Sequence, residues 1–171
     1  MLKKVGIILG NFIKSSTKNE KMWIFLFPFV GTILIYLFFN CRVTDFKLFA
    51  DDFNETVINV TALLASFGLA ALSILISSSS DNIERAKETY TKRKDIMNKE
   101  MSYYKLQVVR NFFALFIQIL VLSMSLIYKF ITEVILNIEV YFYIELFWLM
   151  IAIMAQIFVI ISMYYLFVGK K

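Results

Sequence analysis

Four long apolar runs, separated by short charged segments, dominate the chain. They cover residues 22–40, 56–77, 108–129 and 140–168. Each is close to or above the roughly 20 residues that an α-helix needs to cross the hydrocarbon core of a bilayer. The pattern predicts four transmembrane helices, and the last of them is long enough to require tilt or to protrude.

The segments between these runs are short. They are predicted as an N-terminal interfacial segment (1–21), an outer loop (41–55), a cytoplasmic amphipathic helical segment (78–107), a second outer loop (130–139) and a cytoplasmic tail (169–171). None is long enough for a separate soluble domain. The expected fold is an all-α integral membrane protein with four transmembrane helices per chain.

Composition supports this assignment, because 60% of the 171 residues are hydrophobic and 17% are aromatic. A soluble domain of this length cannot bury so much apolar surface. The N-terminal stretch, apolar with flanking lysines, is too short to cross. It is interpreted as a helix lying on the inner surface of the membrane, and a loosely ordered tail is the alternative.

Charge sets the orientation. The chain has 18 Lys and Arg residues. Fifteen of them lie in segment 1–21, in segment 78–107 together with Arg110, or in segment 169–171, which four spans would place on one side of the membrane. The other three lie in or beside the two loops on the other side. Positive charge accumulates in cytoplasmic loops. We therefore expect both termini in the cytoplasm, with the protein in the inner membrane of the cell.

Several kinds of chemistry are not expected. The chain has no histidine and one cysteine, Cys41. Histidine-dependent metal sites and catalytic dyads are therefore excluded, as is an internal disulfide. No nucleophile–base pair or glycine-rich phosphate loop is recognisable. We expect no enzymatic activity, no metal and no cofactor.

The second span carries an unusual stripe of small and polar residues. At helical spacing, one line contains Asn59, Ser66, Ala70, Ser73 and Ser77, with Ala62 between the first two. Such a stripe is unfavourable against lipid, so it should face protein or water. Two interpretations stay open: close packing between helices, or the lining of a water-filled pore formed by several copies. Both favour a homo-oligomer, and we expect a tetramer.

Other polar residues interrupt the third and fourth spans. The candidates are Asn111, Gln118, Glu145 and Gln156. Each can bond across helices to the second span. Glu145 is the one acidic residue well inside an apolar run, which makes it a functional candidate. It is also near enough to the start of its span to sit at the membrane interface instead.

The segment 78–107 contains basic residues next to aromatic ones. The candidate contact residues are Tyr90, Lys92, Arg93, Lys94 and Tyr103. Cations beside aromatic rings suit the phosphates and bases of a nucleotide-type ligand. The alternative is ordinary contact with lipid headgroups. Sequence-specific DNA binding is not expected.

An apolar helix of small residues runs directly into a charged helix in LLASFGLAALSILISSSSDNIERAKE, residues 63–88. In a small multi-span chain, this arrangement resembles membrane components of bacterial anti-phage systems, over roughly residues 56–105. One is the Hailong channel effector, which is gated by deoxyadenosine oligomers. The other is the Kiwa membrane protein, a four-span tetramer that senses phage attack and works with a cytoplasmic DNA-binding partner.

The resemblance implies a membrane component of a defence system. If the protein acts like the Hailong effector, the serine stripe would form the pore and the basic–aromatic residues would bind the gating ligand on the cytoplasmic side. If it acts like the Kiwa protein, the segment 81–105 would bind a cytoplasmic protein partner and the acidic outer loops would face the signal. We expect the pore-forming effector, with the sensor or anchor subunit as the alternative.

Overall fold

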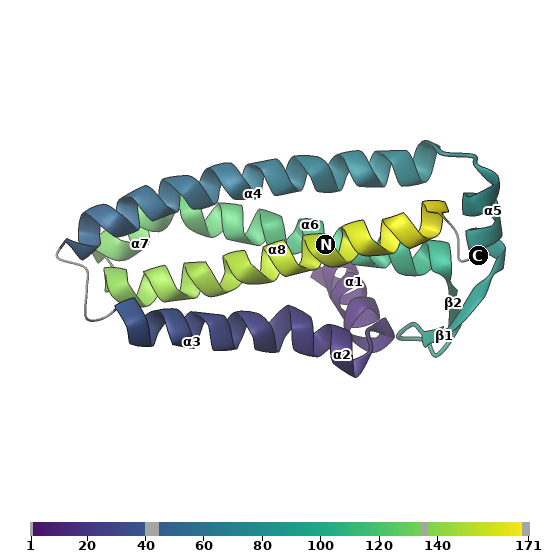
Figure 1. Ribbon diagram of the computed structural model, residues 1–171, viewed down its shortest axis with the longest axis horizontal. Helices are drawn as coiled ribbons and strands as arrows, with labels where there is room; N and C mark the ends of the chain where they lie inside the picture. Colours follow the sequence, from purple (N-terminus) through teal and green to yellow (C-terminus); the bar gives the residue numbers. More distant parts are fainter. Residues whose placement is uncertain (1, 40–44, 135–136, 169–171) are drawn as a thin grey trace.

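Four long helical stretches run side by side along one axis in the computed structural model, which describes residues 2–39, 45–134 and 137–168 (Figure 1). They are α2–η1–α3 (Lys18–Phe39), α4 (Phe46–Ser77), α6 (Tyr103–Leu126) and α8 (Ile138–Val168). Each stretch is long and apolar enough to cross a membrane, as the four apolar runs predict. Cys41 and the predicted tail 169–171 lie outside the described residues.

The first stretch changes its helix type before its proline. It contains α2 (Lys18–Lys21), a π-helical turn η1 (Met22–Leu26) and α3 (Phe27–Phe39). Proline lacks an N–H group, and its ring collides with the carbonyl one turn earlier in a regular α-helix. The wider turn just before Pro28, with Phe27 donating its N–H to the carbonyl of Met22, accommodates the ring.

The core is a three-helix bundle of α4, α6 and α8. Helix α6 lies against both of the others, α4 and α8 also touch, and α3 packs mainly on α8. The buried residues of α6 follow a heptad-like spacing of three and four: Gln107, Asn111, Ala114, Gln118, Val121 and Ser125. This spacing is typical of helices that cross at a shallow angle.

The start of the second span differs from the expected one. Residues 46–55, expected in the outer loop 41–55, are the first turns of α4. The carboxylate of Asp45 caps this helix by accepting a hydrogen bond from the backbone of Leu48, at 3.3 Å. Charged residues mark where a helix leaves the hydrocarbon, and they do not prevent it from continuing.

The other outer boundary also differs. Helix α6 begins at Tyr103 and ends at Leu126, whereas the predicted span was 108–129. The short helix α7 (Tyr128–Val134) covers residues 130–134 of the expected outer loop 130–139, and α8 begins at Ile138 rather than at 140. We call this end of the bundle, with α7 and the start of α4, the α7 end.

The prediction of a purely helical segment at 78–107 is wrong in its second half. Helix α5 (Asp81–Glu88) forms as expected, but β1 (Tyr90–Lys94) and β2 (Glu100–Ser102) form an antiparallel hairpin. The hydroxyl of Thr91 donates to the carbonyl of Met101 across the hairpin, at 2.7 Å. Thr91 is the one β-branched residue of the two strands, so strand preference alone does not explain the hairpin. Its turn is closed by the backbone N–H of Asp95 bonding to the carbonyl of Lys99 and that of Asn98 to the carbonyl of Asp95, at 2.9 and 3.0 Å.

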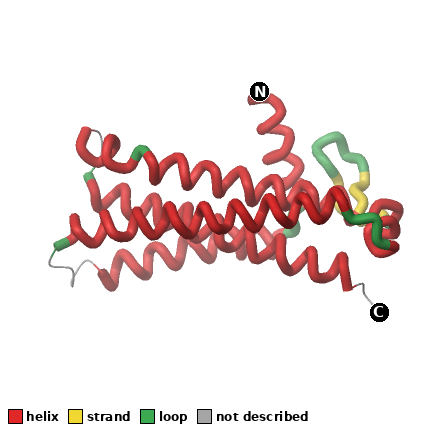
Figure 2. Tube along the Cα trace, turned by 90° about the horizontal axis from the view of Figure 1, so that it is seen from above, coloured by secondary structure: helices red, strands yellow, loops and turns green. Residues whose placement is uncertain are grey.

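The N-terminal segment is a helix, α1 (Leu2–Ser15), that leaves the bundle at a steep angle (Figure 2). It is anchored where the ring of Phe12 stacks on Phe113 of α6, with ring centroids 3.5 Å apart. It also contacts the hairpin, since Lys14 donates to the side-chain oxygen of Asn98, at 2.6 Å. We call this end of the bundle, with α5 and the two strands, the hairpin end.

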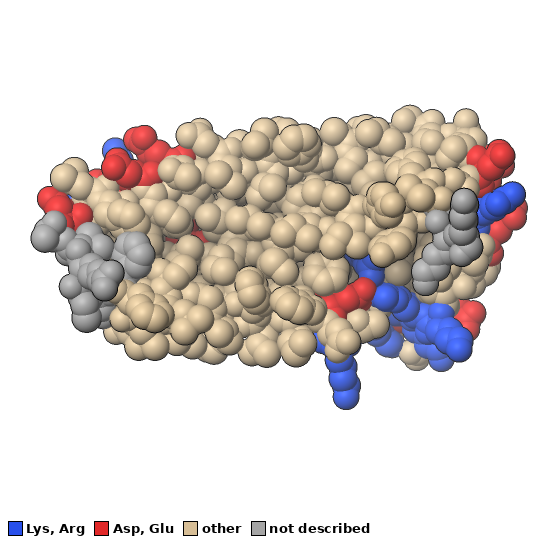
Figure 3. Space-filling model, viewed as in Figure 1, with Lys and Arg blue, Asp and Glu red and all other residues tan. Residues whose placement is uncertain are grey.

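Charged side chains gather toward the two ends of the molecule (Figure 3). The basic residues visible on this face lie almost all at the hairpin end, and acidic residues lie at both ends. The surface between them is predominantly uncharged. This distribution matches a protein whose middle lies in hydrocarbon.

Candidate functional site

The stripe of the second span lies on the outside of the bundle. Its residues Asn59, Ser66, Ala70, Ser73 and Ser77 are all exposed. The residues of α4 that pack against α6 and α8 are a different set: Asn54, Val57, Thr61, Gly68, Leu72 and Leu75. At 3.6 residues per turn, the two sets occupy nearly opposite sides of the helix.

The stripe therefore does not mediate packing within one chain. Two of its hydroxyls are bonded inside the helix, because Ser66 donates to the carbonyl of Ala62 and Ser77 to that of Ser73, at 2.9 and 2.8 Å. Among the described residues, the amide of Asn59 has no hydrogen-bonding partner. We call this outward stripe the α4 outer face.

The four intramembrane polar candidates all lie inside the bundle. Asn111, Gln118, Glu145 and Gln156 are at most 3% exposed. Gln118 of α6 donates to the side-chain oxygen of Gln156 of α8, at 2.9 Å. Of the expected bonds to the second span, the described residues form only that of Glu145, which is made with Asn54 and not with the stripe, and Asn111 has no partner.

Glu145 is buried at the meeting point of three helices. Its Oε1 accepts a hydrogen bond from the Ser125 hydroxyl of α6, at 2.5 Å. With its nitrogen turned toward the carboxyl, the Asn54 amide of α4 donates to the same oxygen at 2.8 Å and to the Ser125 carbonyl at 3.2 Å. Asn54 was not among the predicted residues, although its spacing from Val57 and Thr61 places it on the buried side of α4.

Other buried polar atoms have no protein partner. Both side-chain polar atoms of Asn111 are in this class, together with Oε1 of Gln118 and Oγ1 of Thr61. Buried polar groups are normally hydrogen-bonded, and an unpaired one is destabilising. The interior of the bundle is thus polar along much of its length but only partly satisfied.

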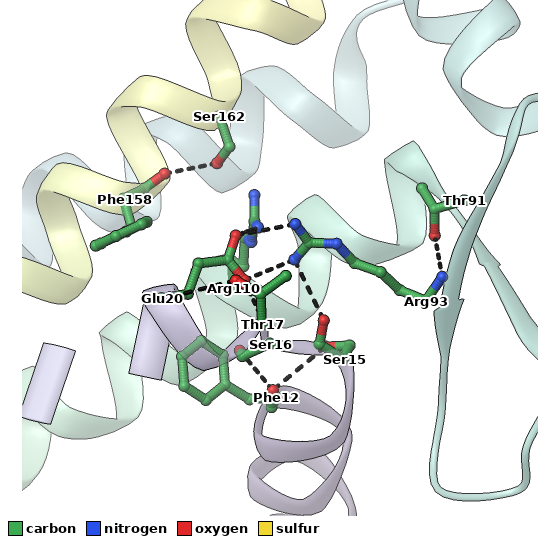
Figure 4. Close-up of polar contacts among 10 residues, drawn as sticks. All are labelled: Phe12, Ser15, Ser16, Thr17, Glu20, Thr91, Arg93, Arg110, Phe158 and Ser162. Carbon is green, nitrogen blue, oxygen red and sulfur yellow. Dashed lines mark hydrogen bonds and ion pairs between the residues drawn. The ribbon is translucent and has the colours of Figure 1, made fainter. Parts of the chain in front are cut away.

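The basic–aromatic candidates do not form one site, because Arg93 points inward and the others are exposed. Arg93 points inward and forms two hydrogen bonds with Glu20, at 2.7 and 3.0 Å. Arg110 of α6 pairs with the same carboxylate, and Arg93 also donates to the carbonyl of Ser15 (Figure 4). Arg93 is therefore committed to a contact that joins the hairpin, α2 and α6.

Glu20 was not among the predicted site residues. Its spacing from Thr17 is that of a capping box, which indicates the start of a helix. The structure forms this box: the Glu20 backbone donates to the Thr17 hydroxyl, and the Glu20 carboxylate accepts from the Thr17 backbone at 2.9 Å. The box fixes the carboxylate where the two arginines reach it.

The remaining basic–aromatic candidates stay on the surface. Tyr90, Lys92 and Lys94 alternate along β1 and are exposed, and Tyr103 is 53% exposed at the start of α6. Alternate residues of a strand point to the same side. Three of the candidates therefore form one face, the β1 outer face, with two ammonium groups and one aromatic ring.

The turn of the hairpin is held by Asp95. Its Oδ1 accepts from the backbones of Met97 and Lys99, at 2.9 and 3.0 Å, and its Oδ2 pairs with Lys105 at 2.9 Å. The Lys105 ammonium, followed by these backbone donors, lowers the pKa of the Asp95 carboxyl below its usual value. Asn98 completes the turn with a φ of 62°, which Asn tolerates better than most residues.

Within residues 2–39, 45–134 and 137–168, no group of three or more acidic or cysteine side chains is arranged to hold a metal ion. No protein-family model matches the sequence, and no similar curated protein or solved structure was found at a significant level.

Proposed function

We propose that the protein is the subunit of an oligomeric ion pathway in a membrane, with the α4 outer face directed toward the pathway. The observation that carries this proposal is the exposure of the whole stripe on the side of α4 away from its own bundle. A stripe with Asn59 and Ser73 is unfavourable in hydrocarbon and favourable beside water or another protein.

Over the described residues, the interior of one chain is packed rather than open. Its centre is filled by small and medium side chains, including Ala114, Ile151 and Ala152, each at most 1% exposed. A pathway lined by several copies is consistent with the flanks of the stripe, where Phe67 and Leu69 are more than half exposed. These apolar flanks suit contacts with neighbouring copies, while the stripe lines the space between them.

The charge asymmetry favours a cytoplasmic location for the hairpin end in a bacterial inner membrane. There α4 leads through 78–80 into α5, which is anchored on the bundle. Ile83 is fully buried, and the Asn82 amide donates to the carbonyl of Phe167 at 2.6 Å. A ligand or partner that displaces α5 would pull on the end of α4, so the pathway is gated from the cytoplasm.

In the cell, this activity would make the protein the pore-forming effector of an anti-phage defence system. Phage sensitivity should differ between cells producing the wild type and cells producing Ser66→Leu or Ser73→Leu. Equal phage sensitivity of the two, at equal membrane abundance, would contradict the defence role while leaving the pathway itself to be tested in vesicles.

Ion flux in liposomes tests the pathway directly. Wild type should release ions, and Ser66→Leu and Ser73→Leu should change the flux, because each places a bulky apolar side chain on the stripe. Ile76→Leu, an exposed flank position with the same side-chain volume, is the matched control. Unchanged flux in both stripe variants, or no flux from a folded oligomer with and without deoxyadenosine oligomers, would contradict the proposal.

A disulfide test examines the oligomer separately. In a Cys41→Ser background, Ser66→Cys should crosslink between copies in the membrane on oxidation. Thr61→Cys, on the buried side of the same helix, should not. Crosslinking at neither position would contradict an oligomer built around the α4 outer face.

The β1 outer face favours a second candidate function, a sensor or anchor subunit that binds a cytoplasmic partner. Lys92 and Lys94 lie at the hairpin end, and neither forms an ion pair with another described residue. If this function is the main one, Lys92→Glu with Lys94→Glu should abolish phage defence and leave vesicle flux unchanged. Loss of flux together with defence would favour the pore instead.

A further inference from the structure

The environment of Glu145 contains hydrogen-bond donors but no cation. One carboxyl oxygen, Oε1, receives the hydrogen bonds of Ser125 and Asn54, whereas Oε2 is buried without a protein partner. The side chain is 1% exposed. Within the described part of the chain, the ion pairs involve other carboxylates, Glu20 and Asp95.

Ionisation of a carboxyl group in this buried environment is energetically unfavourable. Without a nearby cation, burial of its charge costs far more than burial of the neutral acid. The titratable groups that face it from the packed elements are Tyr128 of α7 and Tyr141 of α8, and Asp51 of α4 lies near Tyr128. None of them supplies positive charge, and α6 contributes only the neutral Ser125.

Polar side chains lie between Glu145 and the surface of the α7 end. Among the described residues, no hydrogen bond of ordinary geometry joins them to one another, and the Tyr141 hydroxyl donates to the carbonyl of Met124, at 2.6 Å. A cavity of about 490 Å³ there is lined by Lys47, Asp51 and Lys129, among others. Asp51 lies near the hydroxyl of Tyr128, without a hydrogen bond of ordinary geometry. The ring of Tyr128 is 5.4 Å from that of Tyr141, which stands one helical turn before Glu145.

We propose that Glu145 is a proton-binding site inside the bundle, which exchanges its proton with the solution at the α7 end by way of Asp51, Tyr128 and Tyr141. Binding forms an O–H bond at Oε2 and converts the carboxylate into a neutral carboxylic acid. Oε1 then becomes the carbonyl oxygen and still accepts from Ser125 and Asn54. The site does not depend on the proposed ion pathway, because it lies on the opposite side of α4 from the stripe.

Infrared spectroscopy of the protein in liposomes at neutral pH detects the proton itself. The carbonyl stretching band of a protonated carboxylic acid, shifted in deuterated water, should be present in wild type and lost in Glu145→Gln. Glu139→Gln, an exposed glutamate in the first turn of the same helix, should retain the band. Absence of the band in wild type, or its persistence in Glu145→Gln, would overturn the proposal.

Three further measurements apply even if Glu145→Gln fails to fold. Ser125→Ala should move the band to higher frequency, since the carbonyl loses a hydrogen bond, and an unmoved band would overturn the assignment. Asp51→Asn should slow deuterium exchange of the band several-fold, and an unchanged rate would overturn the route. Replacement of the band by a carboxylate signal when sodium is added at fixed pH would identify a metal-cation site and overturn the proton site.

Discussion

The two faces of α4 share some residue types, but only one of them is buried. Each carries one asparagine, at least one small residue and at least one hydroxyl at helical spacing. On the core face, Asn54, Thr61 and Gly68 pack against α6 and α8; on the outer face, Asn59, Ser66 and Ala70 are exposed. Small and polar residues on an apolar helix therefore do not by themselves tell which face packs within its own chain.

The largest difference is expected between Gly68 and Ala70. A Cβ atom at Gly68 would stand 2.8 Å from Cδ2 of Leu115 and 3.3 Å from Oε1 of Gln118. Gly68→Leu should lower the free energy of unfolding in detergent by about 3 kcal/mol, as overpacked sites do. Ala70→Leu should change it by less than about 0.5 kcal/mol. Equal effects of the two would remove the distinction between the faces.

An intermediate difference is expected between the two asparagines. Asn54→Leu removes a donor to Glu145 and should lower the free energy of unfolding by about 1–3 kcal/mol, the usual cost of a lost buried partner. Asn59→Leu should leave that quantity unchanged in monomers, while it weakens association of copies in vesicles. Denaturant titration and crosslinking measure the two quantities. Destabilisation of the monomer by Asn59→Leu would place that residue in the core.

The smallest difference concerns the two hydroxyls. Oγ1 of Thr61 is buried without a partner, whereas Ser66 is bonded to the carbonyl of Ala62. Thr61→Val keeps the shape and removes an unpaired polar atom, so it should raise the free energy of unfolding by about 0.5–1 kcal/mol. Ser66→Ala should be neutral within about 0.5 kcal/mol. A loss of stability in Thr61→Val would mean that its hydroxyl is paired in the membrane.

Much of the fold was predictable, because hydrophobic length is a local property. Four runs of apolar residues led to four helices, and small errors arose only at their ends. Asp45 and Asp51 illustrate the reason for these errors. Charged residues indicate exposure to water, but a helix can extend into water when its end is capped. The hairpin at 90–102 was not predicted, because its stabilising contacts include Asn98 with Lys14 of α1, far away in the sequence.

The sequence indicated which polar and charged residues are unusual, but not which residues each of them contacts. Arg93 was expected to contact a ligand, yet it contacts Glu20, which comes from a different element 73 positions away. Glu145 was recognised as unusual, but its neighbours Asn54 and Ser125 belong to two other helices. Neither partner is identifiable from spacing within one helix alone.

The sequence by itself determined the number of apolar helices, the asymmetry of their charge and the position of polar residues along each of them. These properties depend only on residue type and helical periodicity. The tertiary structure decided which side of α4 is buried, which carboxylate meets arginines and which meets only neutral donors. Those outcomes depend on the rotation of each helix about its axis, and that rotation is set by packing against α6 and α8.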